Sequence, residues 1–199
     1  MGRGHLFKAT DPDAIPLRVA NMTLGGLFTS RLNMNLREKH GYSYGVGSSV
    51  SLLRRTGTFS ARGGIVAQNT VEAVAEYENE LQRFSGGTVT AAELAAAKEA
   101  LVRGLPANLE TNDAVSGAMA NLVSLGLPLD YYRTYAAKVG RVSQADVKRV
   151  ATRWIKPARW PVVIVGPVAQ SKEALEKLNL GPVSIAPAVP GGKPAASTP

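Results

Sequence analysis

The sequence predicts an α+β fold, a two-layer sandwich in which helices pack on one face of a mainly antiparallel sheet. Three observations lead to this prediction. A β-hairpin pattern stands between helical stretches, several helical stretches follow it in a row, and one buried-looking strand pattern comes late in the chain. Helices that are not interleaved one by one with strands favour this class over a parallel α/β fold.

Length and composition fit one domain with a tail. The 199 residues are 45% hydrophobic and 19% charged, which is enough for one core. We expect a domain over residues 1–181 and a flexible Pro/Ala-rich tail over residues 182–199. Cysteine is absent, which excludes disulfides, a thiolate nucleophile and cysteine-ligated metal sites. No stretch reaches the roughly 18 apolar residues of a membrane span.

Two helices and a hairpin are predicted in the first third of the chain. Asp11 and Asp13 can cap a first helix that ends at Gly25-Gly26, and Thr29 or Ser30 can cap a second that ends at Gly41. Residues 42–53 and 58–66 alternate as strands around a turn. The alternation places these residues on one face of the first strand: Tyr42, Tyr44, Val46, Ser48 and Val50.

The rest of the chain reads mainly as helices. Thr90 and Glu93 form a capping box for one of them. The expected helices span about residues 69–84, 90–105, 112–125, 130–138, 143–155 and 172–178, and a strand is expected over residues 160–165. Three strands make a thin sheet, so we expect an edge that is missing or supplied by a partner.

One run carries a family resemblance. Residues 24–49 read LGGLFTSRLNMNLREKHGYSYGVGSS, which resembles the C-terminal halves of insulinase/pitrilysin-type zinc metallopeptidases, the inverzincins, and the related mitochondrial processing peptidase subunits. Further similar segments extend the resemblance from about residue 11 to 181. The family implies two similar α/β halves around a chamber, with zinc on the N-terminal half. Only residues 3–7 could remain of a first strand, so an N-terminal truncation is expected.

The resemblance places no metal in this chain. His5 and His40 are its two histidines, and no His-x-x-Glu-His run occurs. A catalytic zinc ion normally takes three protein ligands. No cofactor is therefore expected on this chain, and zinc is expected in a complementary half.

The resemblance also implies a substrate-binding site. Arg37 and Tyr44 match the Arg-x-x-x-x-x-x-Tyr spacing of residues that reach the substrate in the family. A guanidinium offers a rigid fork of donors to a peptide carbonyl, and a tyrosine hydroxyl can donate to a developing oxyanion. Gly45 and Gly47 would let an extended peptide approach the strand closely.

The leading hypothesis is part of a zinc metalloendopeptidase that binds extended peptides, completes the active site of a zinc-bearing homologous half and is inactive alone. That half could be in the same polypeptide or a separate subunit. One alternative is a non-catalytic scaffold subunit similar to respiratory-complex core subunits. Another is a module that binds anions or a membrane surface through the basic helix 143–156, since the net charge is +8.

Two further expectations concern nucleic acids and location. We expect no nucleic-acid binding, because Trp154 falls on the buried face of the basic helix rather than among its cations. The Pro/Ala-rich tail favours a bacterial periplasmic or envelope location over the cytoplasm.

Overall fold

A three-stranded antiparallel sheet is the centre of the described chain. The computed structural model describes residues 2–5, 7–107, 109–157, 160–167 and 171–186. The strands are β1 (Gly2–His5), β2 (Ser43–Leu52) and β3 (Gly57–Ile65), and their order is β1-β3-β2. Phe59 of β3 pairs with Arg3 on one side and with Val50 on the other. The predicted hairpin and the mixed α+β class are confirmed.

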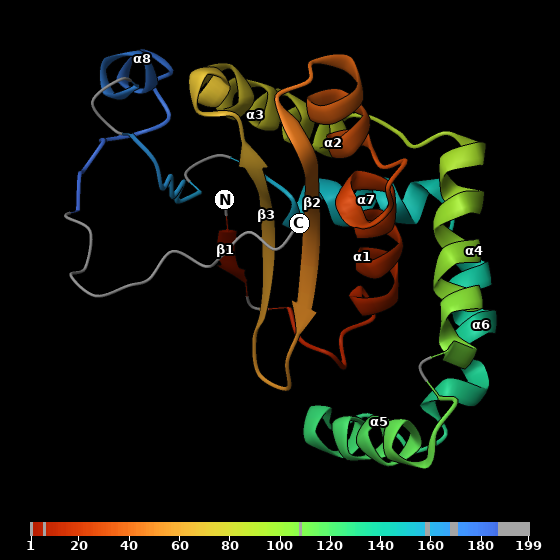
Figure 1. The fold of residues 1–199 in the computed structure, drawn as a ribbon. Helices are drawn as coiled ribbons and strands as arrows, with labels where there is room; N and C mark the ends of the chain where they lie inside the picture. Colours follow the sequence, from red (N-terminus) through yellow and green to blue (C-terminus); the bar gives the residue numbers. More distant parts are fainter. Residues whose placement is uncertain (1, 6, 108, 158–159, 168–170, 187–199) are drawn as a thin grey trace.

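Helical segments make up most of the remainder (Figure 1). Two of them are π-helical and one is a 3₁₀ turn. In chain order they are α1 (Ala14–Asn21), η1 (Met22–Gly26), α2 (Arg31–Asn33), η2 (Met34–Lys39), η3 (Ala67–Asn69), α3 (Thr70–Gly86), α4 (Ala91–Ala107), α5 (Asn112–Leu125), α6 (Tyr131–Arg141), α7 (Gln144–Trp154) and α8 (Lys172–Lys177).

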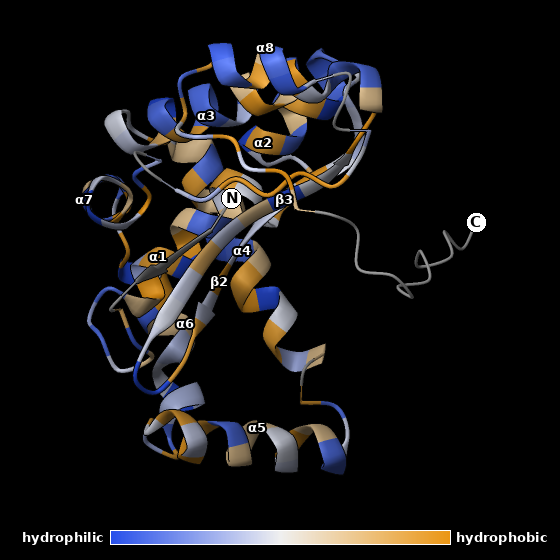
Figure 2. Cartoon of the chain, turned by 90° about the vertical axis from the view of Figure 1, so that its left-hand side faces the viewer, coloured by the Kyte–Doolittle hydropathy of each residue, from blue (hydrophilic) through white to orange (hydrophobic). Residues whose placement is uncertain are grey.

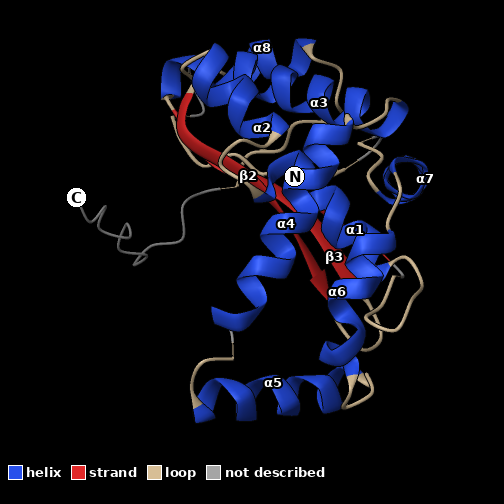
Figure 3. Cartoon of the chain, turned by 90° about the vertical axis from the view of Figure 1, so that its right-hand side faces the viewer, coloured by secondary structure: helices blue, strands red, loops and turns tan. Residues whose placement is uncertain are grey.

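The helices α1, α4 and α6 lie on one side of the β2–β3 hairpin. Figure 2 looks onto the sheet with these helices behind it, and Figure 3 looks from the helical side. Val46 and Phe59 on the helical side are buried. The opposite side carries glycine and polar residues, among them the exposed Arg62, and the Ser49 and Ser60 hydroxyls there lie 2.9 Å apart. The sheet therefore has one face on the core and one open, polar face.

The core joins the sheet to α1 and α7. Leu17 and Val19 of α1 and Val147 and Val150 of α7 are all at most 1% exposed. Capping boxes begin α4 and α7, where Glu93 accepts from the Thr90 N–H and Asp146 accepts from the Ser143 N–H. Such reciprocal side-chain bonds satisfy the first N–H groups of a helix. The capping box predicted at Thr90 and Glu93 is confirmed by both of its bonds.

The strand predicted over residues 160–165 does not form, and the sheet is completed by β1 instead. Residues 160–165 form no strand, and Val163 and Val165 are 80% and 97% exposed. Their predecessor Trp160 is buried, with its ring 5.1 Å from that of Phe59. The prediction is wrong because an apolar run becomes a strand only when another backbone pairs with it, and residues 160–165 pair with no described strand.

The predicted side-chain caps of the first two helices are also wrong. Neither Asp13 nor Ser30 caps its helix with its side chain. Asp13 is 5% exposed and its carboxylate accepts from Trp154 Nε1 at 2.8 Å and from Arg149 and Arg153. A buried carboxylate is stabilised better by cationic donors from α7 than by its own helix N-terminus. Gly41 does end η2 with φ +66°.

Two further expectations concern the C-terminal tail and membrane spans. The predicted tail falls largely on residues 187–199, which lie outside the described residues, and residues 182–186 are irregular. Among the described helices, none combines the length and apolar character that a membrane span requires.

Candidate functional site

Tyr44 projects from a β-bulge. Ser43 pairs with Ile65 and Gly45 pairs with Gly64, so Tyr44 is an extra residue in β2. The Ser43 hydroxyl holds the bulge by donating to the Gly64 carbonyl (2.5 Å) and accepting from the Gly45 N–H (3.0 Å). Bulges re-aim side chains, and Tyr44 is 93% exposed.

The predicted alternation of side chains along this strand is wrong at Tyr44, because the bulge shifts the register there. Tyr44 does not share a face with Val46, which is 9% exposed and packs in the core. A two-residue period cannot detect one inserted residue, because the residues on either side still alternate.

The two predicted site glycines have different surroundings. A Cβ at Gly45 would meet nothing within 4 Å, so its backbone is open to an approaching chain. A Cβ at Gly47 would lie 2.8 Å from the Gly25 carbonyl oxygen. Gly47 therefore lets β2 pack closely against η1, which is a structural requirement independent of any substrate.

Arg37 lies in the π-helical turn η2, a geometry that often occurs at functional sites. Its side chain is 34% exposed, and its Nε lies 3.4 Å from Glu38 Oε1. Its guanidinium carbon lies 4.2 Å from the centroid of the Phe28 ring. A cation held over an aromatic face gains electrostatic attraction and loses mobility, so Phe28 limits the orientations of Arg37.

Phe28 contacts the predicted site residue Arg37 and was not singled out from the sequence. It is 63% exposed, which is unusual for a phenylalanine unless it serves a surface contact. Its place three residues before the start of α2 suggested no more than a loop position. Its pairing with Arg37, nine positions later, depends on the chain reversal between η1 and α2 and carries no local signal.

Asn33 connects the two parts of the site. It is 3% exposed, its Nδ2 donates to the Phe28 carbonyl at 2.7 Å, and its Oδ1 accepts from the Val46 N–H at 3.2 Å. One buried amide thus fixes the loop that carries Phe28 and the strand just after Tyr44. No hydrogen bond links Arg37 directly to Tyr44 within the described residues.

A second buried amide anchors η2 to α3. Asn35 donates to Glu76 at 3.0 Å and to Glu80 at 3.1 Å, and Arg83 pairs with Glu80 at 2.6 Å. Burial raises the pKa of Glu76, but hydrogen bonds from Asn35 and Asn79 and the nearby cations outweigh it and lower that pKa. The network holds the turn that carries Arg37 by charge-assisted hydrogen bonds.

The residues that the structure describes do not fit a zinc site. His40 stacks on Tyr42 with ring centroids 4.9 Å apart, and its Nε2 lies 3.8 Å from Glu76. That single carboxylate does not complete a ligand set, and the described residues contain no group of three or more His, Asp or Glu side chains that could hold a metal ion.

The basic helix is partly neutralised. Arg149 and Arg153 of α7 both pair with Asp13, and Arg149 also lies 3.5 Å from Asp146. The burial of Asp13 raises its pKa, but its hydrogen bonds to Arg149 and Trp154 outweigh this and lower it. Two of the four cations over residues 143–156, Arg149 and Arg153, are therefore paired with a buried carboxylate although their own side chains are 48% and 62% exposed.

Comparisons with a family model and with curated proteins indicate the class of this protein. Residues 5–101 match the family model of the Peptidase M16 inactive domain. An uncharacterized zinc protease of Mycobacterium tuberculosis is 25% identical over 165 residues, which are 82% of this chain and 37% of that protein. The chain thus spans little more than a third of the curated relatives it matches.

Solved structures show the same fold. A peptidase M16 inactive domain from Pseudomonas fluorescens superposes with a TM-score of 0.69 at 23% identity, over 76% of this chain and 37% of that one. A chain of Complex III2 from Candida albicans gives a TM-score of 0.64 at 21% identity, over 76% of this chain and 38% of that one.

Residues 5–101 of this chain therefore resemble the Peptidase M16 inactive domain, the C-terminal type of domain in this family of zinc proteases. The resemblance stated from residues 24–49 is confirmed. This chain is distantly similar to a zinc protease and, in its fold, to a chain of complex III.

Proposed function

We propose that this chain is the non-zinc half of an M16 metalloendopeptidase and that it binds extended peptide substrates next to a zinc-bearing half. The observation that carries the proposal is the pair of ordered, accessible donors at one end of β2. Tyr44 is re-aimed to solvent by a bulge, and Arg37 is held over Phe28.

The surroundings of Tyr44 suit an extended peptide. Gly45 presents open backbone beside the tyrosine, and the sheet face around Ser49 and Ser60 is polar. A peptide lying there would keep its backbone groups hydrogen-bonded or hydrated. The Phe28 ring supplies an apolar contact for a substrate side chain beside Arg37.

The two donors have separate roles in this proposal. The Arg37 guanidinium binds a carbonyl of the bound peptide and fixes its register. The Tyr44 hydroxyl makes no hydrogen bond with the described residues of the chain, so it is free to donate to a carbonyl oxygen. That bond strengthens as negative charge develops on the oxygen during hydrolysis.

Peptide hydrolysis by reconstituted halves tests the proposal. This chain alone is expected to be inactive, and activity is expected when it is mixed with a zinc-bearing M16 half. Arg37→Ala is expected to lower kcat/KM by about tenfold to a hundredfold, the loss of one charge-assisted hydrogen bond. Arg55→Ala is the matched control, because Arg55 is exposed in the β2–β3 turn.

A scaffold role is the competing function, and the complex III likeness is the observation that favours it. Association of the halves without turnover would support the scaffold. Turnover by this chain alone that a chelator abolishes would contradict both functions.

A further inference from the structure

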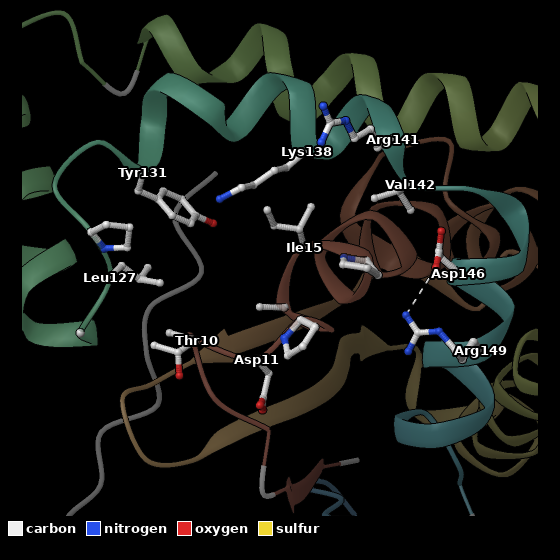
Figure 4. A pocket seen from close by; sticks show the side chains of 16 residues that line it. Thr10, Asp11, Ile15, Leu127, Tyr131, Lys138, Arg141, Val142, Asp146 and Arg149 are labelled. Carbon is white, nitrogen blue, oxygen red and sulfur yellow. Dashed lines mark hydrogen bonds and ion pairs between the residues drawn. The ribbon is translucent and has the colours of Figure 1, made fainter.

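A pocket of about 540 Å³ lies far from the candidate site. It is formed by the start of α1, the α5–α6 turn, the end of α6 and the first turns of α7 (Figure 4). Gly126, which lines it, lies beside Arg54 in the β2–β3 turn. The pocket is thus near the opposite end of β2 from Tyr44, about 25–30 Å away along a strand of this length.

The size and lining of the pocket suit a small molecule or a single peptide residue. Ligand sites commonly have volumes of about 300–1,000 Å³, mostly apolar walls and a few convergent polar groups. The apolar part of the lining consists of Pro12, Ile15, Pro16, Leu127, Pro128 and Val142. The ring of Tyr131 adds an aromatic wall.

The carboxylates at the pocket are already engaged. Asp11 accepts from the Lys8 N–H at 2.7 Å. Asp146 accepts from the Ser143 N–H and hydroxyl at 3.0 and 2.6 Å, as part of the α7 capping box. Arg149 pairs with Asp146 and Asp13. Asp146 and Arg149 thus offset each other within the fold, whereas Asp11 keeps its negative charge, because a backbone N–H does not neutralise a carboxylate.

Two cations at the pocket remain uncompensated. Neither Lys138 nor Arg141 forms an ion pair with any described residue. Lys138 reaches from α6 across the pocket toward Tyr131, and its Nζ lies 5.8 Å from the centroid of that ring (Figure 4).

A third positive charge lies near the Tyr131 wall. The Arg18 Nε is buried and has no hydrogen-bond partner among the described residues. Burial raises the pKa of Tyr131, and the charge of Arg18 opposes that rise. The pocket thus combines an apolar floor with an excess of positive charge, which attracts an anion.

We infer that this pocket binds a small amphipathic carboxylate. Its apolar body would lie on the floor between Ile15, Leu127 and the Tyr131 ring, and its carboxylate would accept from Lys138. Arg141, whose guanidinium does not point toward Tyr131 (Figure 4), would add positive charge at the rim. A free aryl or alkyl carboxylate and the C-terminal residue of a peptide offer the same chemistry. The site is separate from the proposed peptide-binding surface and does not depend on it.

Isothermal titration of the full chain tests the inference. The probes are 4-phenylbutanoate, its neutral amide, and N-acetyl-Ala-Phe with a free or an amidated C-terminus. At least one carboxylate is expected to bind saturably, and its amide about tenfold more weakly, as for the loss of a charged hydrogen bond. If only the peptide acid binds, the occupant is a peptide terminus; if only phenylbutanoate binds, it is a free acid.

Variants locate the binding. Lys138→Met keeps the length of the side chain and is expected to weaken carboxylate binding about fivefold, and the double variant with Arg141→Met at least about tenfold. Lys148→Met is the control, because Lys148 is exposed on α7 and does not line the pocket. The inference is overturned if no carboxylate saturates the protein, if acid and amide bind equally, or if the double variant binds within twofold of the wild type.

Discussion

At the scale of single residues, buried polar groups organise this domain. Asp13 connects α1 to α7 through two arginines and a tryptophan, Asn33 connects the Phe28 loop to β2, and Asn35 connects η2 to α3. Each buried group would be costly without its partners. Apart from the bond between Asn33 and Phe28, which are five positions apart, the partners lie far apart in the chain and have no local sequence signal.

Asp13→Asn is expected to lower the free energy of unfolding by about 2–3 kcal/mol. The amide cannot accept three charged or indole donors as the carboxylate does, and the side chain of Asp13 is only 7% exposed. The loss stays in this range because Arg149 and Arg153 are about half exposed and keep water as a partner. Urea denaturation measures it, with the exposed Asp130→Asn as control; equal stabilities would contradict the role given to Asp13.

Glu93 gives a pH-dependent contribution to stability. Its hydrogen bonds from Arg31, at 2.6 and 2.9 Å, and from the Thr90 N–H lower its pKa from 4.5 to about 2. Because the folded-state pKa is depressed, the stabilisation is complete above about pH 5 and is lost as the pH falls toward 2. Glu93→Gln is expected to remove about 1–3 kcal/mol at pH 7 and to flatten stability over that pH range.

The control for this titration is Glu99→Gln. Glu99 pairs with Arg103 on an exposed helix face, where both side chains are more than half exposed, so its removal is expected to change stability by less than about 0.5 kcal/mol. A pH profile of Glu93→Gln parallel to that of the wild type would show that another carboxylate is responsible.

At the scale of elements, patterns with local causes were predictable. The hairpin, the capping boxes and the left-handed Gly41 follow from residues a few positions apart. The bulge at Tyr44 and the irregular course of residues 160–165 do not, because both depend on pairing with a distant strand. Arg37 and Tyr44 are site predictions made through the resemblance, whereas the contact of Phe28 with Arg37 and the Lys138 pocket required the three-dimensional arrangement.

The contact between η1 and β2 gives a matched pair of substitutions. Gly47→Ala would place a Cβ 2.8 Å from the Gly25 backbone oxygen, so we expect a loss of about 1–3 kcal/mol from overpacking. Gly45→Ala meets nothing within 4 Å and is expected to change stability by less than about 0.5 kcal/mol. Thermal and urea melts compare the two, and equal losses would show that the close approach is not what requires glycine.

At the scale of the whole molecule, the fold separates its surfaces. Helices cover one face of the sheet (Figures 2 and 3), and the other face carries exposed polar residues such as Ser49, Thr58 and Arg62. A domain of this kind can place donors against a peptide but offers no metal ligand set within its described residues. The proposed function therefore requires a second half.

The most direct measurement of the central claim is the steady-state kinetics of Tyr44→Phe in the assembled halves. If the hydroxyl donates to the developing oxyanion, kcat is expected to fall about 10²–10³-fold with little change in KM, at unchanged association of the halves. Tyr132→Phe, on α6, is the control and is expected to retain full activity. A Tyr44→Phe variant with wild-type kcat would contradict the claim that this domain completes the active site through Tyr44.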